Sequence, residues 1–360
     1  MSRKYFILVF ILVLASITLY SSDISAEKVG YDLQKYLEIS INESRELKEA
    51  EINTAEKEIA LEKEMAEQEL RPSPLLLKKA ELELKLAEKK ADLAEDEIRY
   101  QLVNDFFNYY KADNLVSIHR KYTNILEKEL ENIKDKYEQG DLIKTDLLRA
   151  ESELEKAESN FQKAVNNKKK IAFKLKQNLN MDYRNELGID FKENALKEWK
   201  LTKNLEELLQ TALKKRLEFK EAEANLELKE ISYKISAADY SSQLSEKSAE
   251  NELMNAENRL EIVKDMIRLD VNNKYLDYQN TKEDKEHFKK LIESLSEALR
   301  IKKLYFESDY ITGTELLETE VDLYQAEINY SNAEIDYYLS IAELYLSTGE
   351  FKEMLIYAEK

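Results

Sequence analysis

Apolar residues recur every seven positions in two stretches of the chain, 137–179 and 306–348. In each stretch, a row of large apolar side chains is followed three residues later by a row of mostly small ones. In the first stretch the large row is Leu147, Leu154, Phe161 and Leu175, and the small row is Ala150, Ala157, Ala164 and Ile171. A sustained period of seven is typical of helices packed as a coiled coil. The pattern therefore predicts an all-α chain of long, antiparallel coiled-coil helices.

The second stretch repeats the first at a constant offset of 169 residues, which pairs Asp146 with Glu315 and Leu154 with Leu323. A second echo, Glu46–Glu51 with Glu218–Glu223, extends the similarity toward the start of each half. Internal repeats of this kind fix the architecture before any local prediction. We expect two tandem helical repeats, 27–180 and 203–360, joined by a linking segment at 181–202 that loses the period.

The first repeat is expected to contain three helices, over 31–70, 78–137 and about 145–179. Pro72 and Pro74 should end the first helix, because the residue before a proline is pushed out of the helical region.

The segment Leu75–Leu77 is expected to form a short apolar turn before the second helix. Gly140 should end that second helix. Either Thr145 or Asp146 is expected to cap the third helix.

Composition supports long helices and excludes several functions. The chain has 360 residues with only five Gly and two Pro, and 36% are charged, a bias typical of coiled coils. The net charge of −18 argues against a nucleic-acid partner. Cysteine is absent, and His119 and His287 stand far apart in the sequence, so neither a metal site nor a cofactor is expected. We find no phosphate-binding loop and no nucleophile–base set, and expect no enzyme.

The N-terminus predicts export. Arg3 and Lys4 precede sixteen mostly apolar residues, 5–20, and the small residue Ala26 follows at the exit. This order is typical of a secretory signal peptide over 1–26. The same features also fit an uncleaved N-terminal anchor. Either way, the chain is expected in the cell envelope.

The chain resembles the TolC family of outer-membrane efflux proteins. The resemblance rests on the pattern Y-x-x-G…T-D-L-L-x-A-x-x-x-L-x-x-A at Tyr137–Ala157 and on its copy at Phe306–Ala326. It covers nearly the whole chain after the signal segment. It implies an α-barrel subunit of a homotrimeric helical tunnel, associated with the periplasm and outer membrane. Such a tunnel would dock with a periplasmic adaptor (membrane fusion protein) and an inner-membrane transporter to export solutes.

The resemblance also implies a site at the turns between the long helices. The channel aperture would be formed by Asp146, Glu315 and Glu318, with Arg149 at the position equivalent to Glu318. The residues that would face an adaptor are Gly140, Asp141, Leu142, Asp309, Tyr310 and Ile311. A simpler interpretation remains open, in which the acids only complement helix dipoles and Gly140 only ends a helix.

In one respect the sequence departs from the family. TolC-like proteins insert a β-hairpin between the two long helices of each half, and a membrane hairpin needs roughly 22 residues. Only about a dozen residues separate Leu70 from Leu82, and Ser236–Leu253 lacks alternating apolar positions. We therefore expect a TolC-like helical subunit without membrane strands. The alternative function is a structural coiled-coil spacer or interaction protein of the envelope.

Overall fold

The computed structural model describes residues 30–191, 199–238, 241–308 and 310–358, so the predicted signal segment lies outside the described residues. The first repeat contains β1 (Gly30–Tyr31), α2 (Leu33–Asn42), α3 (Arg45–Gln68), α4 (Pro74–Gln139) and α5 (Lys144–Asn178). The linking segment contains β2 (Gly188–Ile189). The second repeat contains α7 (Leu205–Lys215), α8 (Leu217–Ser236), α9 (Gln243–Glu307), α10 (Gly313–Thr348) and α11 (Phe351–Ala358).

The two repeats have the same order of helices and almost the same helix lengths. The long helices α4 and α9 have 66 and 65 residues, and the helices that follow them, α5 and α10, have 35 and 36. Strand structure within the described residues is limited to β1 and β2, which pair in parallel. The predicted all-α chain of two tandem repeats is confirmed.

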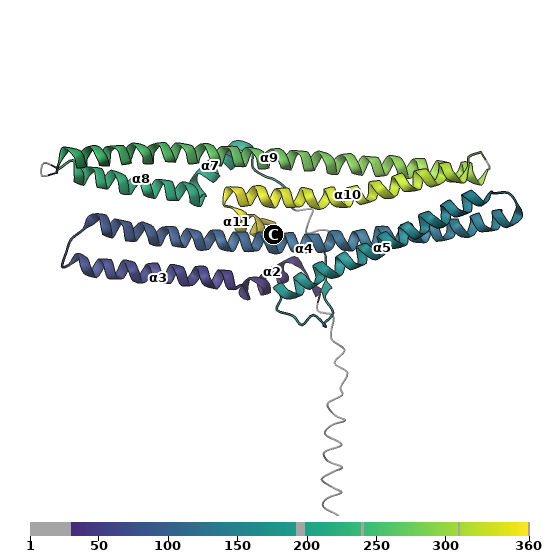
Figure 1. Cartoon of the computed structure of the whole chain (residues 1–360), viewed down its shortest axis with the longest axis horizontal. Helices are drawn as coiled ribbons and strands as arrows, with labels where there is room; N and C mark the ends of the chain where they lie inside the picture. Colours follow the sequence, from purple (N-terminus) through teal and green to yellow (C-terminus); the bar gives the residue numbers. More distant parts are fainter. Residues whose placement is uncertain (1–29, 192–198, 239–240, 309, 359–360) are drawn as a thin grey trace, which may run out of the picture.

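The helices form one elongated layer of four rows (Figure 1). The long helices α4 and α9 run along most of it, and the shorter helices pack beside them. In one half of the molecule the order across the layer is α3, α4, α8, α9; in the other half α4, α10 and α9 keep this order, and α5 crosses α4 toward the hairpin tips. The half that contains α3 and α8 therefore has two different edges: an α3 edge and an α9 edge.

The contact between the repeats follows one row of lysines on α4. Each lysine pairs with a carboxylate of α8 or α10: Lys78 with Glu227 (2.8 Å), Lys90 with Glu221 (2.9 Å), Lys111 with Asp336 (3.3 Å) and Lys121 with Glu327 (2.6 Å). Exposed pairs of this kind contribute little stability individually, about 0–1 kcal/mol each. Together they mark the line along which α4 of the first repeat lies beside α8 and α10 of the second.

Two of the predicted helix boundaries are wrong. The expected helix over 31–70 is broken after Asn42, because Ser44 starts a new helix by accepting a hydrogen bond from the backbone N–H of Leu47 at 3.3 Å. Leu75–Leu77 do not form a turn but lie in the first turn of α4. Proline is tolerated at the first helical position, where its missing N–H would have no partner, and Pro74 starts the helix there.

The predicted break at Gly140 is confirmed, but the predicted cap of α5 is wrong. Gly140 has φ of 85°, the left-handed conformation that glycine adopts without strain, and the N–H of Asp141 reaches back to the carbonyl of Lys136 at 2.9 Å. The cap of α5 is Ile143, which makes no side-chain capping bond. Thr145 and Asp146 lie in the first turn of the helix instead.

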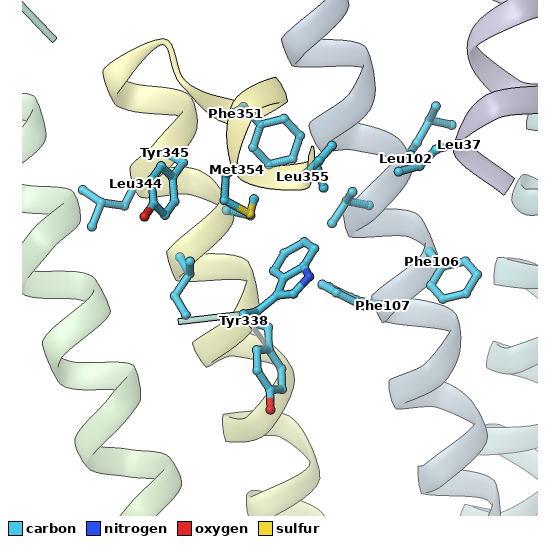
Figure 2. Close-up of a cluster of buried hydrophobic side chains, with 14 of the residues drawn as sticks. Leu37, Leu102, Phe106, Phe107, Tyr338, Leu344, Tyr345, Phe351, Met354 and Leu355 are labelled. Atoms are coloured by element: carbon cyan, nitrogen blue, oxygen red, sulfur yellow. The ribbon is translucent and has the colours of Figure 1, made fainter. Parts of the chain in front are cut away.

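The main core lies where the described residues of the linking segment pack against both repeats. Phe107 of α4 faces Tyr338 of α10, and Phe351, Met354 and Leu355 of α11 close one side (Figure 2). Trp199 of the linking segment is 4% exposed and packs edge-on against Phe107, with ring centroids 5.0 Å apart. This core joins both repeats and holds the two pairs of long helices together in the middle of the molecule.

Candidate functional site

The two turns that the sequence singles out lie at the same end of the molecule, one from each repeat (Figure 1). The α4–α5 turn runs from Gly140 to Ile143, and the α9–α10 turn runs from Ser308 to Thr312. Asp309 lies outside the described residues. Each turn ends one helix and starts the next within a few residues, so each repeat presents a compact hairpin tip at this end.

The α9–α10 turn is held by a capping box. The hydroxyl of Thr312 accepts a hydrogen bond from the N–H of Glu315 at 3.3 Å, and the Glu315 carboxylate accepts one from the N–H of Thr312 at 2.9 Å. These bonds favour the charged carboxylate and lower the pKa of Glu315, with the backbone hydrogen bond as the largest cause. Glu315 thus caps the helix and keeps its negative charge at the tip.

The other predicted aperture residues have no such fixed partner. Asp146 is half-buried in the first turn of α5, and Arg149 and Glu318 are exposed one turn into α5 and α10. Among the described residues, no ion pair within 4.0 Å involves any of the three. The structure therefore places the four predicted residues at one end of the molecule, but their side chains are not linked to one another within one chain.

The predicted docking residues differ in how far they project. Tyr310 is 82% exposed and lies edge-on to Tyr305, with ring centroids 6.4 Å apart. Gly140 and Asp141 are exposed, whereas Leu142 and Ile311 are half-buried. Ile143, which the sequence analysis did not select, is 67% exposed. The tips therefore carry an exposed aromatic and an exposed aliphatic side chain beside charged groups.

A small cluster joins the two hairpins behind their tips. Its buried members are Tyr122, Leu126 and Ala157, and Leu154, Leu317 and Tyr324 pack against them. The rings of Tyr122 and Tyr324 stack with centroids 4.0 Å apart, and the Tyr324 hydroxyl lies 2.6 Å from Nδ1 of His119. Burial lowers the pKa of His119. Sequence reasoning treated His119 as isolated, since its partner lies on another helix, 205 positions away.

Both edges of the layer carry exposed apolar side chains. On the α9 edge, Met254, Ile262, Met266, Leu269 and Leu276 are all more than half exposed. Their spacing of 8, 4, 3 and 7 residues places them on one face of the helix. On the α3 edge, Ile52 and Ile59 are 62% and 67% exposed, and none of the described residues of α3 is fully buried. Each edge therefore presents an apolar stripe with no partner in the same chain.

Within the part of the chain that the structure describes, no helix is long and apolar enough to span a bilayer.

Comparison with known proteins finds similarity in structure but not in sequence. No protein-family model matches the chain, and no curated protein matches it. Among solved structures, the outer-membrane channel OprN superposes with a TM-score of 0.73 at 14% identity, covering 88% of this chain and 90% of that one. VceC of Vibrio cholerae gives a TM-score of 0.70 at 12% identity, covering 89% and 96%. The open MtrE channel of Neisseria gonorrhoeae gives 0.67 at 14% identity, covering 89% of each chain. The resemblance to TolC-family channels is therefore confirmed at the level of the fold: this chain has the two-repeat helical fold of the outer-membrane efflux channels.

Proposed function

We propose that the chain is the subunit of a trimeric helical tunnel in a TolC-like export system of the cell envelope. In this proposal the layer of helices is one segment of the tunnel wall. The observation that carries the proposal is the pair of unpartnered apolar stripes on the two edges of the layer. Supporting it is the fold, which the chain shares with outer-membrane channels over about nine-tenths of its length.

The two stripes fit a ring. They lie on different helices, α3 and α9, so the contact between neighbouring subunits would join unlike surfaces. Such head-to-tail contacts generate closed rings when the rotation closes. Met254 and Ile262 lie in the same half of the molecule as Ile52 and Ile59, between the linking segment and the α3–α4 and α8–α9 turns. The two stripes would therefore meet at the same level. The number three comes from the resemblance to TolC-like channels.

The hairpin tips would form the inner end of the tunnel. Asp146, Glu315 and Glu318 of three subunits would then make rings of carboxylates, which favour cations in a narrow pore. The lowered pKa of Glu315 supports a charged ring at neutral pH. The exposed turn residues, among them Tyr310, would meet a periplasmic adaptor, which in turn would connect to an inner-membrane transporter. In this role the protein conducts solutes and catalyses no reaction.

The first test is the mass of the chain from residue 27 onward, measured by light scattering without detergent. We expect a trimer. A monomer or a symmetric dimer would contradict the tunnel and favour the envelope spacer.

Edge variants sharpen this test. Ile262→Glu places a charge in the α9 stripe, and Ile59→Glu does so in the α3 stripe; each should break the trimer. The matched controls Lys264→Gln and Asn53→Asp change the net charge by the same amount outside the stripes and should leave the trimer intact. Ile262→Glu leaves the α3 edge unchanged and Ile59→Glu leaves the α9 edge unchanged, so a mixture of the two variants should form a heterodimer but no closed ring. If subunits instead met through two α9 edges, Ile59→Glu would leave the assembly unchanged.

A further inference from the structure

Near the hairpin tips, the seam between α4 and α10 holds one buried and one half-buried carboxyl group. Glu320 of α10 is 7% exposed and pairs with Lys303 of α9, with Nζ and Oε1 3.2 Å apart. Glu129 of α4 has a buried oxygen, Oε2, for which the described residues offer no hydrogen-bond partner. A buried acceptor without a partner is uncommon and calls for an explanation. The capping and packing described above do not use Glu129.

On its own helix, Glu129 is flanked by Leu126 and Leu130, which are both less than a tenth exposed. The charged groups that act on it come from two other helices: Glu320 from α10 raises its pKa, and Lys303 from α9 lowers it. From α5, Glu153 acts on Tyr122 of α4, on which Glu129 and Glu320 also act. One lysine therefore serves both carboxyl groups of the seam.

These surroundings favour the neutral form of Glu129. Burial is the largest cause, the charge of Glu320 adds to it, and together they raise the pKa of Glu129 to about 7. A protonated carboxyl could sit in this seam without a second counter-ion. An ionised one would place two negative charges beside the single charge of Lys303.

The position of the pair matters because the seam is where the two hairpins meet. Glu129 lies ten residues before the end of α4 at Gln139, and Glu320 lies seven residues after the start of α10 at Gly313. At 1.5 Å per residue, these separations correspond to about 15 Å and 10 Å from the tips. A change in the seam at this depth would be transmitted to the tips by two stiff helices.

We propose that Glu129 and Glu320 form a proton-controlled latch between the hairpins α4–α5 and α9–α10. When Glu129 holds its proton, the seam stays packed and the tips stay together. When Glu129 releases its proton to solvent, repulsion from Glu320 loosens the seam and the tips separate. The latch is a property of one chain. Its role as a gate of the tunnel rests on the proposed function.

The direction of the pH effect follows from linkage. The closed seam binds the Glu129 proton more tightly than an open seam, in which Glu129 would return toward its ordinary pKa of 4.5. The stabilisation of the closed seam is therefore complete below about pH 4.5 and is lost as the pH rises through about 7. Acid should close the tips, and mild alkali should open them.

The absence of cysteine allows a direct test. Spin labels at Glu138→Cys and Glu307→Cys, both exposed and each at the tip end of its helix, report the distance between the hairpins. Labelled chain from residue 27 onward is mixed with excess unlabelled chain, so that the distance is measured within one chain by pulsed electron resonance. We expect a longer and broader distance at pH 8 than at pH 5.5, with a midpoint near pH 7.

Three variants assign the effect. Glu129→Gln should keep the short distance at both pH values. Glu320→Gln should lower the midpoint by about one pH unit, because the like charge is gone and Lys303 is free to pair with Glu129. The matched control Glu127→Gln, on the exposed side of the same helix, should behave as the unchanged chain.

A distance that does not depend on pH, or a pH response that survives in Glu129→Gln, would overturn the latch. Circular dichroism at both pH values shows whether each variant is folded. If Glu129→Gln does not fold, the test rests on Glu320→Gln: a pH midpoint of the spin-label distance equal to that of the unchanged chain would also overturn the latch. The mass of the same samples tests the tunnel separately: a monomer whose tips move with pH would keep the latch and reject the tunnel.

Discussion

The replacement Phe107→Ala tests whether the central core holds the two repeats together. Phe107 is 1% exposed, and its ring contacts residues from the linking segment and from the other repeat: Trp199 at 5.0 Å, Phe191 at 6.3 Å and Tyr338 at 6.3 Å between centroids. Removing a fully buried phenylalanine typically costs about 3–5 kcal/mol of unfolding free energy. Since three aromatic contacts are lost together, we expect a cost of about 4 kcal/mol.

The assay is urea unfolding followed by circular dichroism and by the fluorescence of Trp199, the only tryptophan in the chain. Because Trp199 touches Phe107, its fluorescence reports the core itself. Phe107→Leu keeps most of the apolar volume and should cost about 1 kcal/mol. The matched control is Phe173→Ala on α5, where the side chain is 49% exposed and the expected cost is below about 1 kcal/mol. If Phe107→Ala costs no more than Phe173→Ala, the central core does not hold the repeats together.

Two further predictions concern the hairpin turns. Gly140→Ala should destabilise the chain by about 1 kcal/mol in urea unfolding, because a side chain is strained at φ of 85° even though its Cβ would meet no atom within 4 Å. Gly313 lies in the first turn of α10, and a Cβ there would make an ordinary contact of 3.7 Å with Phe306 of α9. Gly313→Ala should therefore be neutral or slightly stabilising. Equal effects at the two positions would contradict this account. Thr312→Ala removes the hydroxyl bond to Glu315, so the pKa of Glu315 should rise toward its ordinary value in a carbon-13 NMR titration. Thr312→Ser, which keeps the hydroxyl, should leave that pKa low; a Glu315 pKa that is equal in both variants would show that the Thr312 hydroxyl does not help to lower it.

Much of the fold could be predicted from local sequence signals. The seven-residue period specifies coiled-coil helices, because it keeps one face of each helix apolar along its whole length. The internal repeat specifies two equivalent halves, and Gly140 marks a turn that needs the left-handed conformation. The errors came where one residue type can act in two ways. Pro74 was taken as a helix breaker, but it starts α4, and the difference depends on whether Ser73 before it can cap the helix.

The candidate site was predictable only in part. The repeat places Asp146, Arg149, Glu315 and Glu318 at equivalent turns, and both turns do lie at one end of the molecule. The capping role of Glu315 was foreseeable, since threonine followed by glutamate three residues later is a local pattern. The aperture role of these acids and the docking role of the turn residues remain predictions.

The helices, the two repeats and the turns could be read from patterns along the chain, because periodicity, repetition and turn residues are properties of the sequence alone. Which helices lie side by side depends on how the chain folds. The tertiary structure placed His119 against Tyr324, put Glu129 and Glu320 into one seam with Lys303, and left apolar stripes open on α3 and α9. These pairings join residues far apart in the sequence, and they depend on how two similar repeats pack against each other. A period of seven makes every helix able to pack, but it does not specify the partner.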